Sequence, residues 1–315
     1  MKFIAGLAAL SASLALSLAQ AQTLAITIDD GPDTRSTPHM SAPQRNQAML
    51  DALARHKVQA ALFVTSGHGA NTPDGMQLLR AWSQAGHAIG NHTVSHPDLH
   101  KVDLASYQQE VLECDRLIRT LPGYQKWLRF TYLREGNTPE KIEGMRSFLR
   151  EHGYRNAQVS IDTSDWRLNE ALEQVLKTDP AADVSAIRSA YLAHVRQRML
   201  AYRELSHTLQ GRDIAQVLLL HHNLINAMWL DDILVQAKEM GWKIIPPAAA
   251  FADPVYQLEP VRKAAGQSLL LSLGRTLGLG LTPGGERLVD DGDFEIAQLQ
   301  ARGVLPPPAP AAAKK

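Results

Sequence analysis

Short apolar runs alternate with amphipathic helical patterns between Leu24 and Ile245, and this alternation restricts the fold more than any other feature of the chain. The runs have the length of strands, and glycines end several of the helical patterns between them. Strands separated by helices pair in parallel, because a parallel connection needs a long crossover. We therefore expect about seven parallel strands, at residues 24–28, 60–64, 87–91, 128–132, 157–161, 217–220 and 242–245.

The alternation predicts a parallel (β/α) barrel, with an open doubly wound sheet as the alternative, because strand count does not determine closure. No Gly-x-Gly-x-x-Gly pattern follows the first strand, so the dinucleotide-binding form of the open sheet lacks its mark. Residues 167–210 are helical in character and contain no clear strand. We expect them to form a helical insertion before the sixth strand.

The first 21 residues have the pattern of a cleavable signal peptide. Lys2 precedes a mostly apolar stretch at residues 3–18, and residues 19–21 (Ala-Gln-Ala) have the small-x-small pattern of a cleavage site. No later segment is long and apolar enough to span a bilayer, so we expect a secreted or periplasmic protein that is not an integral membrane protein. The rest of the chain divides into three expected parts: a main domain (22–254), a C-terminal extension (255–305) and a disordered Pro/Ala-rich tail (306–315).

The charge balance excludes a broad basic surface. The chain has 32 Lys and Arg residues and 32 Asp and Glu residues, so nothing in its charge favours nucleic acid as a partner. A neutral polymer or a small molecule fits this balance better. The chain has one cysteine, Cys114, and therefore no internal disulfide. This residue falls on the apolar face of a predicted helix, so we expect a buried, inert thiol.

Polar side chains directly follow five of the predicted strands. In a parallel barrel, catalytic groups gather where strands end and the following loops begin. Each cluster alone has an ordinary structural explanation, such as a turn, a helix cap or a surface charge. Five such placements favour one shared site, made of Asp29 with Asp30, His92 with His96, Arg129 with Tyr132, Asp162 with Asp165 and Trp166, and His221 with His222.

These residue types allow metal-assisted hydrolysis of an amide or an ester. One carboxylate and two imidazoles form a ligand set that leaves open positions for water and substrate. Such a metal lowers the pKa of bound water and polarises a carbonyl group. A second carboxylate can act as a general base. A separate histidine, held as imidazolium by a nearby aspartate, can protonate a leaving amine.

Four short motifs resemble those of the polysaccharide deacetylases, the NodB-homology or carbohydrate esterase family 4 enzymes. Residues 26–31 (Ile-Thr-Ile-Asp-Asp-Gly) are similar to their Thr-Phe-Asp-Asp-Gly motif, and residues 92–96 to their His-Ser/Thr-x-x-His motif. Residues 162–166 resemble Asp-x-x-Asp-Trp, and residues 218–221 resemble the final Leu-x-Leu-x-His-type motif. The resemblance covers about 24–245 and implies a distorted (β/α) barrel of about seven strands.

The resemblance also implies the reacting groups of the site. Asp29 is the expected catalytic base. His221 is the expected catalytic acid, with Asp165 setting its charge. A divalent metal ion, zinc first and cobalt or nickel as alternatives, is expected to have three protein ligands: Asp30, His92 and His96.

Four further residues have implied supporting roles. Arg129 is expected to orient the base, and the backbone N–H of Tyr132 to help bind the oxyanion. Trp166 and Leu218 are expected to line the acetyl pocket as substrate-binding residues.

Two departures from the family pattern affect these assignments. The family's third motif is Arg-x-Pro-aromatic, but Thr131 stands here in place of the proline, so the Tyr132 amide is less firmly placed by sequence. Arg134 is an alternative to Arg129, and His222 is an alternative to His221, which the motif register favours.

The resemblance thus implies a hydrolase that removes N-acetyl groups from an acetylated amino-sugar polymer or oligomer by attack of metal-bound water. One alternative keeps the site and changes the substrate to a small non-sugar amide or ester, because only 6% of the residues are aromatic and no extended sugar-stacking platform is evident. Another alternative is a non-catalytic carbohydrate-binding protein on the same scaffold.

Overall fold

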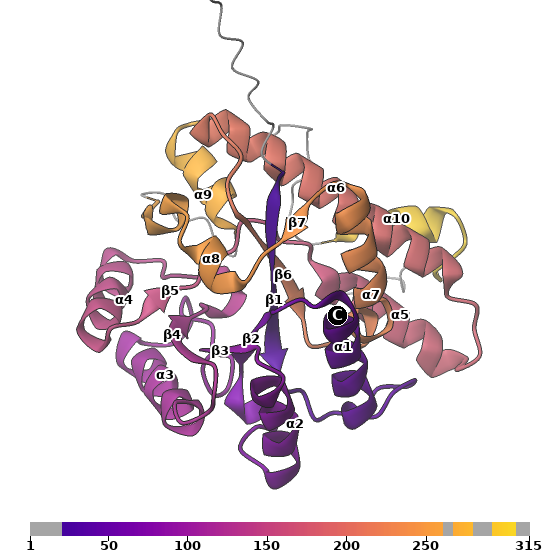
Figure 1. The fold of residues 1–315 in the computed structure, drawn as a ribbon, viewed down its shortest axis with the longest axis horizontal. Coiled ribbons are helices and arrows are strands. Elements are labelled where there is room, and N and C mark those ends of the chain that lie inside the picture. The colour runs from indigo at the N-terminus through magenta and orange to yellow at the C-terminus, as the bar shows by residue number, and fades with distance from the viewer. Residues whose placement is uncertain (1–20, 261–266, 280–291, 307–315) are drawn as a thin grey trace, which may run out of the picture.

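The computed structural model describes residues 21–260, 267–279 and 292–306, and its centre is a curled parallel sheet (Figure 1). Most of the predicted signal peptide and of the predicted tail lies outside the described residues. Seven strands form this sheet, and all of their pairings are parallel, as the alternation predicted. The strands are β1 (Thr23–Gly31), β2 (Ala61–Val64), β3 (Ala88–Asn91), β4 (Tyr124–Leu128), β5 (Arg155–Asn156), β6 (Gln216–His221) and β7 (Lys243–Ile244).

Helices connect the strands and pack around the sheet, as Figure 1 shows. Capping residues mark where several of them begin; Ser41, for example, forms a reciprocal capping box with Gln44 at the start of the first helix. The α-helices in the described part are α1 (Ala42–His56), α2 (Pro73–Gln84), α3 (Leu104–Ile118), α4 (Pro139–His152), α5 (Asp165–Thr178), α6 (Ser185–Gln210), α7 (Leu224–Glu239), α8 (Pro247–Phe251), α9 (Leu269–Thr276) and α10 (Asp293–Ala301).

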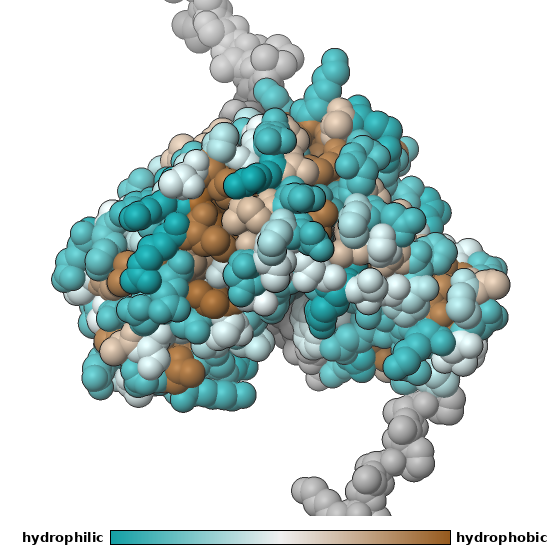
Figure 2. Space-filling view, turned by 90° about the horizontal axis from the view of Figure 1, so that it is seen from below, coloured by the Kyte–Doolittle hydropathy of each residue, from teal (hydrophilic) through white to brown (hydrophobic). Residues whose placement is uncertain are grey.

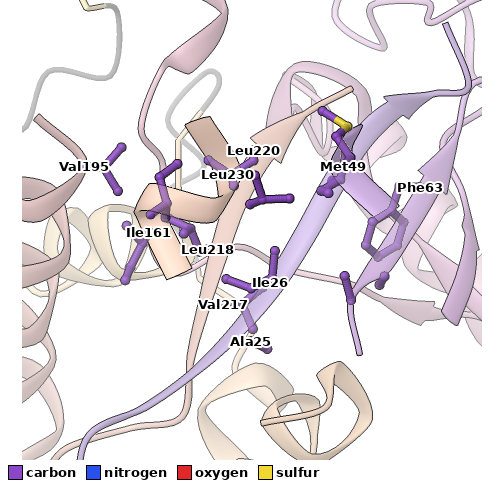
Figure 3. Packing of buried hydrophobic residues seen from close by; sticks show 14 of the residues in the cluster. Ala25, Ile26, Met49, Phe63, Ile161, Val195, Val217, Leu218, Leu220 and Leu230 are labelled. Carbon is purple, nitrogen blue, oxygen red and sulfur yellow. The ribbon is translucent and has the colours of Figure 1, made fainter. Parts of the chain in front are cut away.

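The sheet curls until its two edges approach one another. Its strand order is β5-β4-β3-β2-β1-β6, and β7 pairs with the start of β1. The stretch that follows β5 joins the edges: the Ala157 N–H donates to the Leu128 carbonyl of β4 at 2.8 Å, and Ile161 bridges to Leu218 of β6. Figure 3 shows Ile161 beside Leu218. The chain therefore forms a distorted barrel, and the open doubly wound sheet is excluded.

Two strands differ in position from the sequence prediction. The predicted strand 128–132 is shifted to Tyr124–Leu128, because Tyr132 and Leu133 have positive φ angles of 55° and 52° and the short helix η2 (Thr131–Leu133) forms there instead. The predicted strand 157–161 has its regular pairing at Arg155–Asn156, and it reaches β6 only by a single bridge. Apolar composition located both segments but not their pairing.

The core lies on both sides of β1. This strand is buried along most of its length, because β6 pairs on one side while β2 and β7 pair on the other. Figure 3 shows side chains of β1 and β6 against residues of three surrounding helices: Met49 of α1, Val195 of α6 and Leu230 of α7. The predicted helical insertion before the sixth strand is confirmed as α5 and α6, and the buried face of α6 belongs to this core.

The described residues beyond 254 pack on the same core. The short helix η3 (Pro254–Gln257) contributes Val255 and Tyr256, and α10 contributes Ile296 and Leu299. None of the helices in the described ranges combines the length and the apolar character that crossing a membrane requires. Cys114 is fully buried in α3, and burial raises its pKa to about 12. It is therefore the inert thiol that the sequence predicts.

We expect the substitution Gly90→Ala to destabilise the barrel. A Cβ at Gly90 of β3 would lie 2.5 Å from a ring carbon of Phe63 in β2, so one of the two strands must shift. Overpacking of this kind lowers the free energy of unfolding by about 1–3 kcal/mol. Urea-induced unfolding of the wild type and the variant measures the difference. An unchanged midpoint would show that this contact is looser than the structure indicates.

Candidate functional site

The carboxyl ends of the strands surround a cavity of about 780 Å³. Figure 2 views the molecule from the side toward which β1 points in Figure 1; this face is mainly hydrophilic, with hydrophobic patches between polar side chains. The cavity brings together eight residues of the predicted shared site: Asp29, Asp30, His92, His96, Tyr132, Asp162, Trp166 and His221. Arg129 and Asp165 are almost completely buried directly behind it, each bonded to one of these side chains.

Leu218 does not line the cavity. Its side chain is fully buried beside Ile161 on the outer face of β6, against the helices. Side chains alternate between the two faces of a strand, so the next residue, Leu219, points the other way and lines the cavity. Of the two leucines, Leu219 and not Leu218 is therefore in a position to contact a bound substrate.

Asp30, His92 and His96 form a group that could hold a metal ion. One potential ligand atom from each lies within 4.8 Å of the others. The Nε2 atoms of His92 and His96 lie 3.7 and 3.5 Å from Asp30 Oδ1. His92 Nδ1 donates to the Arg129 carbonyl at 2.7 Å, which leaves the lone pair of Nε2 free to face the group.

The charge states of this group also suit a divalent cation. Burial lowers the pKa of both imidazoles, so they are neutral and have a lone pair to offer. Burial alone would raise the pKa of Asp30, but the neighbouring His96 and His92 hold it well below its usual range. One anionic oxygen and two neutral nitrogens are ligands typical of a zinc site, and all three residues line the cavity.

Asp29 is held by a buried arginine. Arg129 Nη1 lies 3.0 and 3.1 Å from the two Asp29 oxygens, and its Nε donates to the Ala157 carbonyl. The guanidinium also lies 4.3 Å from the centre of the Phe63 ring. Burial raises the pKa of Asp29 to about 6, although Arg129 opposes this shift. Asp29 therefore has the affinity for protons that a base working near neutral pH needs.

Arg134 is not an alternative partner for Asp29. It forms an ion pair with Asp98 on the neighbouring loop, and its guanidinium lies 5.4 Å from the centre of the Tyr132 ring. Of the two candidate arginines, Arg129 alone contacts Asp29.

His221 and Asp165 form a second buried pair on the other side of the cavity. His221 Nδ1 lies 2.6 Å from Asp165 Oδ1, and Asp165 Oδ2 accepts from the His221 backbone N–H and from Asn223 and Asn226. Burial alone would lower the pKa of His221, but the Asp165 carboxylate outweighs burial and raises it to about 10. His221 is therefore an imidazolium at neutral pH, with its charge fixed by Asp165.

His222 faces the opposite side of β6 and lies in the core. Its Nδ1 accepts from the Asp33 backbone N–H at 3.3 Å, and its Nε2 lies 3.0 Å from Asn46 Oδ1. Burial lowers its pKa to about 4, so it is neutral. Its environment fits a structural histidine, whereas His221 has the position and the charge of an acid.

Backbone strain collects around the cavity. Residues other than glycine rarely adopt positive φ, and they keep it only where the surrounding structure fixes them. Lys57 has positive φ as an ordinary helix C-cap. The other described non-glycine residues with positive φ all lie in loops that carry site residues: Asp30, Thr93, His96, Tyr132, Leu133 and Ser164.

Hydrogen bonds replace the missing proline at Thr131. Its N–H donates to the Tyr107 hydroxyl at 3.2 Å, and its own hydroxyl lies 3.1 Å from the same oxygen and donates to the Pro97 carbonyl. The segment before Tyr132 is thereby tied to the loop that carries His96. The Tyr132 ring packs edge-on to the His96 ring, with centroids 4.4 Å apart.

Several supporting residues were missed by sequence reasoning. Thr65 donates to Asp30 Oδ1 at 3.2 Å, and His68 lines the cavity with its ring 6.2 Å from that of His96. Asn223 and Asn226 hold Asp165. Asn223 is the N-cap of α7, a position that its sequence predicts, but nothing in the sequence signals its contact with Asp165.

The family expectation is confirmed by comparison with known proteins. Residues 19–157 match the family model described as polysaccharide deacetylase. The match includes Asp29, Asp30, His92, His96 and Arg129, and it ends before Asp165 and His221.

Proteins named as deacetylases are among the similar sequences. The chain is 32% identical over 145 residues to a peptidoglycan-N-acetylglucosamine deacetylase of Bacillus cereus, covering 46% of each chain. It is 36% identical over 150 residues to a chitooligosaccharide deacetylase of Rhizobium leguminosarum, covering 45% of this chain and 58% of that protein. The chain thus spans between about two fifths and three fifths of the length of these and other curated relatives that it matches.

Solved structures share the fold. The chitin deacetylase of Colletotrichum lindemuthianum superposes with a TM-score of 0.52 and 21% identity over 74% of this chain and 89% of that chain. A carbohydrate esterase family 4 pseudoenzyme of Bacillus anthracis gives a TM-score of 0.50 and 14% identity over 72% of this chain and 64% of that chain. At these identities the likeness shows the distorted barrel alone, and function has to be argued from the site.

We expect Thr131→Val and Tyr107→Phe each to lower the free energy of unfolding by about 1–3 kcal/mol, because each leaves a buried polar group without its partner. The double variant should lose less than the sum, since both changes remove the same hydroxyl pair. Denaturant unfolding of all four proteins completes the cycle. Strictly additive losses would contradict a shared network at this position.

Proposed function

We propose that this chain is a metal-dependent hydrolase that removes N-acetyl groups from an acetylated amino-sugar polymer or oligomer. The observation that carries the proposal is that one cavity holds a possible metal site, a buried carboxylate beside it and a charged histidine facing it. The similarity to deacetylases of peptidoglycan and chitooligosaccharides supports the same bond type. The catalytic domain is proposed to comprise residues 22–254.

Asp30, His92 and His96 are the proposed metal ligands, and zinc suits two imidazoles and a carboxylate best, with cobalt or nickel as alternatives. A divalent ion bound there would lower the pKa of a water molecule and polarise the acetyl carbonyl. Thr65 supports Asp30 and the Arg129 carbonyl orients His92, which is the usual role of residues behind a ligand set.

Asp29 is the proposed general base. Its Oδ2 lies 3.7 Å from His92 Nε2, so it borders the ligand group without being required as a fourth ligand. Arg129 holds the carboxylate by two hydrogen bonds and leaves it able to take a proton from the attacking water. The buried cation also compensates part of the cost of burying the charge.

His221 is the proposed general acid. Its imidazolium is held by Asp165 through Nδ1, so Nε2 carries the proton that the leaving amine must receive. The attack develops negative charge on the carbonyl oxygen, and the proposed protein donor to that oxygen is the backbone N–H of Tyr132.

Two exposed aromatic side chains favour a sugar over a small non-sugar amide or ester. Tyr132 is 51% exposed and Trp166 is 42% exposed, and both line the cavity. Flat rings at the mouth of a polar cavity offer apolar faces to a sugar ring while leaving its hydroxyl groups to solvent.

Acetate release by the purified, metal-loaded protein tests the proposal. The panel comprises N-acetylglucosamine oligomers, peptidoglycan, chitin and simple amides and esters. Release from the amino sugars is the expected result. Release from the simple compounds alone would favour the alternative amidase or esterase, and sugar binding without any release would favour the non-catalytic alternative.

Exchange of Asp29 and of a proposed ligand should have different effects. Asp29→Asn keeps the ligand set and removes the base, so bound metal should stay near one equivalent while kcat falls about 10²–10⁴-fold. His92→Ala should lose both metal and turnover. Metal content by mass spectrometry and acetate release are measured on the same samples. A native rate in Asp29→Asn would refute the assignment of the base.

Asp165→Asn should shift the alkaline side of the pH–rate profile to lower pH. His221 is protonated below its pKa of about 10, and its proton is lost as pH rises through that value. Without the carboxylate, burial dominates and lowers the pKa of His221, so loss of activity begins at lower pH. The profile of kcat/KM reports this change, and an alkaline limb at its wild-type position would contradict the role of Asp165.

A further inference from the structure

Two helices outside the matched family region meet at the loop that carries Asp165. Helix α6 lies in the insertion and α10 lies near the C-terminus, and α10 packs against both α5 and α6 (Figure 1). The loop at residues 162–164 leads into α5, whose first residue is Asp165. The support of this loop therefore comes from parts of the chain beyond the match at 19–157.

The imidazole of His194 in α6 links α10 to this loop. His194 Nε2 lies 2.5 Å from the Thr163 carbonyl oxygen, and His194 Nδ1 lies 2.9 Å from Glu295 Oε1 of α10. The His194 side chain is 1% exposed and that of Glu295 is 14% exposed. A carbonyl and a carboxylate both accept, so both ring nitrogens must donate for the two bonds to form together.

A second contact fixes the other side of the loop. Arg167 Nε donates to Asp293 Oδ1 of α10 at 2.8 Å, and the Arg167 backbone N–H donates to the Ser164 carbonyl at 3.0 Å. A Cβ added at Gly292 would lie 2.9 Å from the Arg167 Cβ, so the start of α10 lies directly against α5.

The loop needs such support. Ser164 has a φ of 47°, a left-handed conformation that costs a residue other than glycine of order 1–3 kcal/mol and persists only when its surroundings fix it. The regular ladder has ended here, because the single bridge at Ile161 is the last pairing before the loop. Inside the loop, Ser164 N–H donates to Asp162 Oδ1, and Thr163 Oγ1 donates to the Leu219 carbonyl.

We propose that His194 and Glu295 are positioning residues, which hold the loop at residues 162–164 so that Asp165 stays aligned with His221. Neither touches the cavity, so each acts through the Thr163 carbonyl and the backbone that follows it. The C-terminal helix is thereby part of the support of the acid side of the site. The catalytic consequence rests on the proposed function; the mechanical link does not.

Glu295→Gln tests the link with little change in size. The variant replaces the charged acceptor of His194 Nδ1 by a neutral amide, and hydrogen bonds to an ionised group are stronger than those to a neutral one. The bond that orients the ring is therefore weaker, and the hold of Nε2 on the Thr163 carbonyl is loosened. We expect kcat to fall about tenfold, with KM changed less than about twofold, because misalignment of a catalytic pair acts on turnover. Amide hydrogen exchange at 162–166 should become faster, since the loop opens more often.

Asp232→Asn is the matched control. It removes a carboxylate of α7 that lies 2.6 Å from Arg188 of α6, the helix of His194, and both side chains of this pair are partly exposed to solvent. It should leave kcat and exchange at 162–166 unchanged. His194→Phe keeps a ring and removes both donors, and should reproduce the effect of Glu295→Gln.

Hydrogen exchange tests whether α10 holds the loop, and turnover tests whether that contact matters for catalysis. Native exchange at 162–166 in Glu295→Gln, or an equal change in Asp232→Asn, would overturn the link. Faster exchange with native kcat would overturn the positioning role. Wild-type protein that releases no acetate would refute the proposed function, while the exchange comparison would still decide whether α10 holds the loop.

Discussion

The parallel pairing of β1 with β6 is the interaction on which the rest of the site depends. It runs without interruption from Leu24 opposite Gln216 to Asp29 opposite His221. Because the register ends on these two residues, the proposed base and the proposed acid face one another across the end of adjacent strands. A shift by one residue would turn each side chain of β6 to the other face and bring His222 into the cavity.

The second constraint on the site is the burial of charged side chains. The barrel almost completely encloses the ion pair of Asp29 with Arg129, and in the pair of Asp165 with His221 the aspartate is fully buried while the histidine borders the cavity. Such pairs contribute little net stability, because the cost of removing both charges from water offsets much of their attraction. Their effect is on protonation. One pair leaves a carboxylate with raised proton affinity, and the other keeps an imidazole charged at neutral pH.

The sequence predicts the barrel and the meeting of Asp30, His92 and His96 for a physical reason. The metal candidates lie directly after buried strands, so local pattern and strand position together determine where they meet. The features that the sequence does not predict depend on contacts between distant parts of the chain. Leu218 and Leu219 are chemically alike, and strand register alone decides which one reaches the cavity. Thr131 lacks the fixed φ of proline, and its compensation comes from Tyr107, distant in sequence. The contact of Glu295 with His194 has no signal in the sequence at all.

The barrel closes by a single bridge at Ile161, so the site residues before and after this bridge are held in place by different kinds of contact. The proposed metal ligands follow regularly paired strands, whose backbone hydrogen bonds depend little on side-chain identity. Asp165 follows the loop beyond this bridge and is held by side chains of helices, whereas His221 is fixed by the regular pairing of β6 with β1. Variation in those helices can therefore re-aim Asp165 without disturbing the ligand group. The irregular closure of the barrel thus leaves the alignment of Asp165 open to change by substitutions far from the cavity.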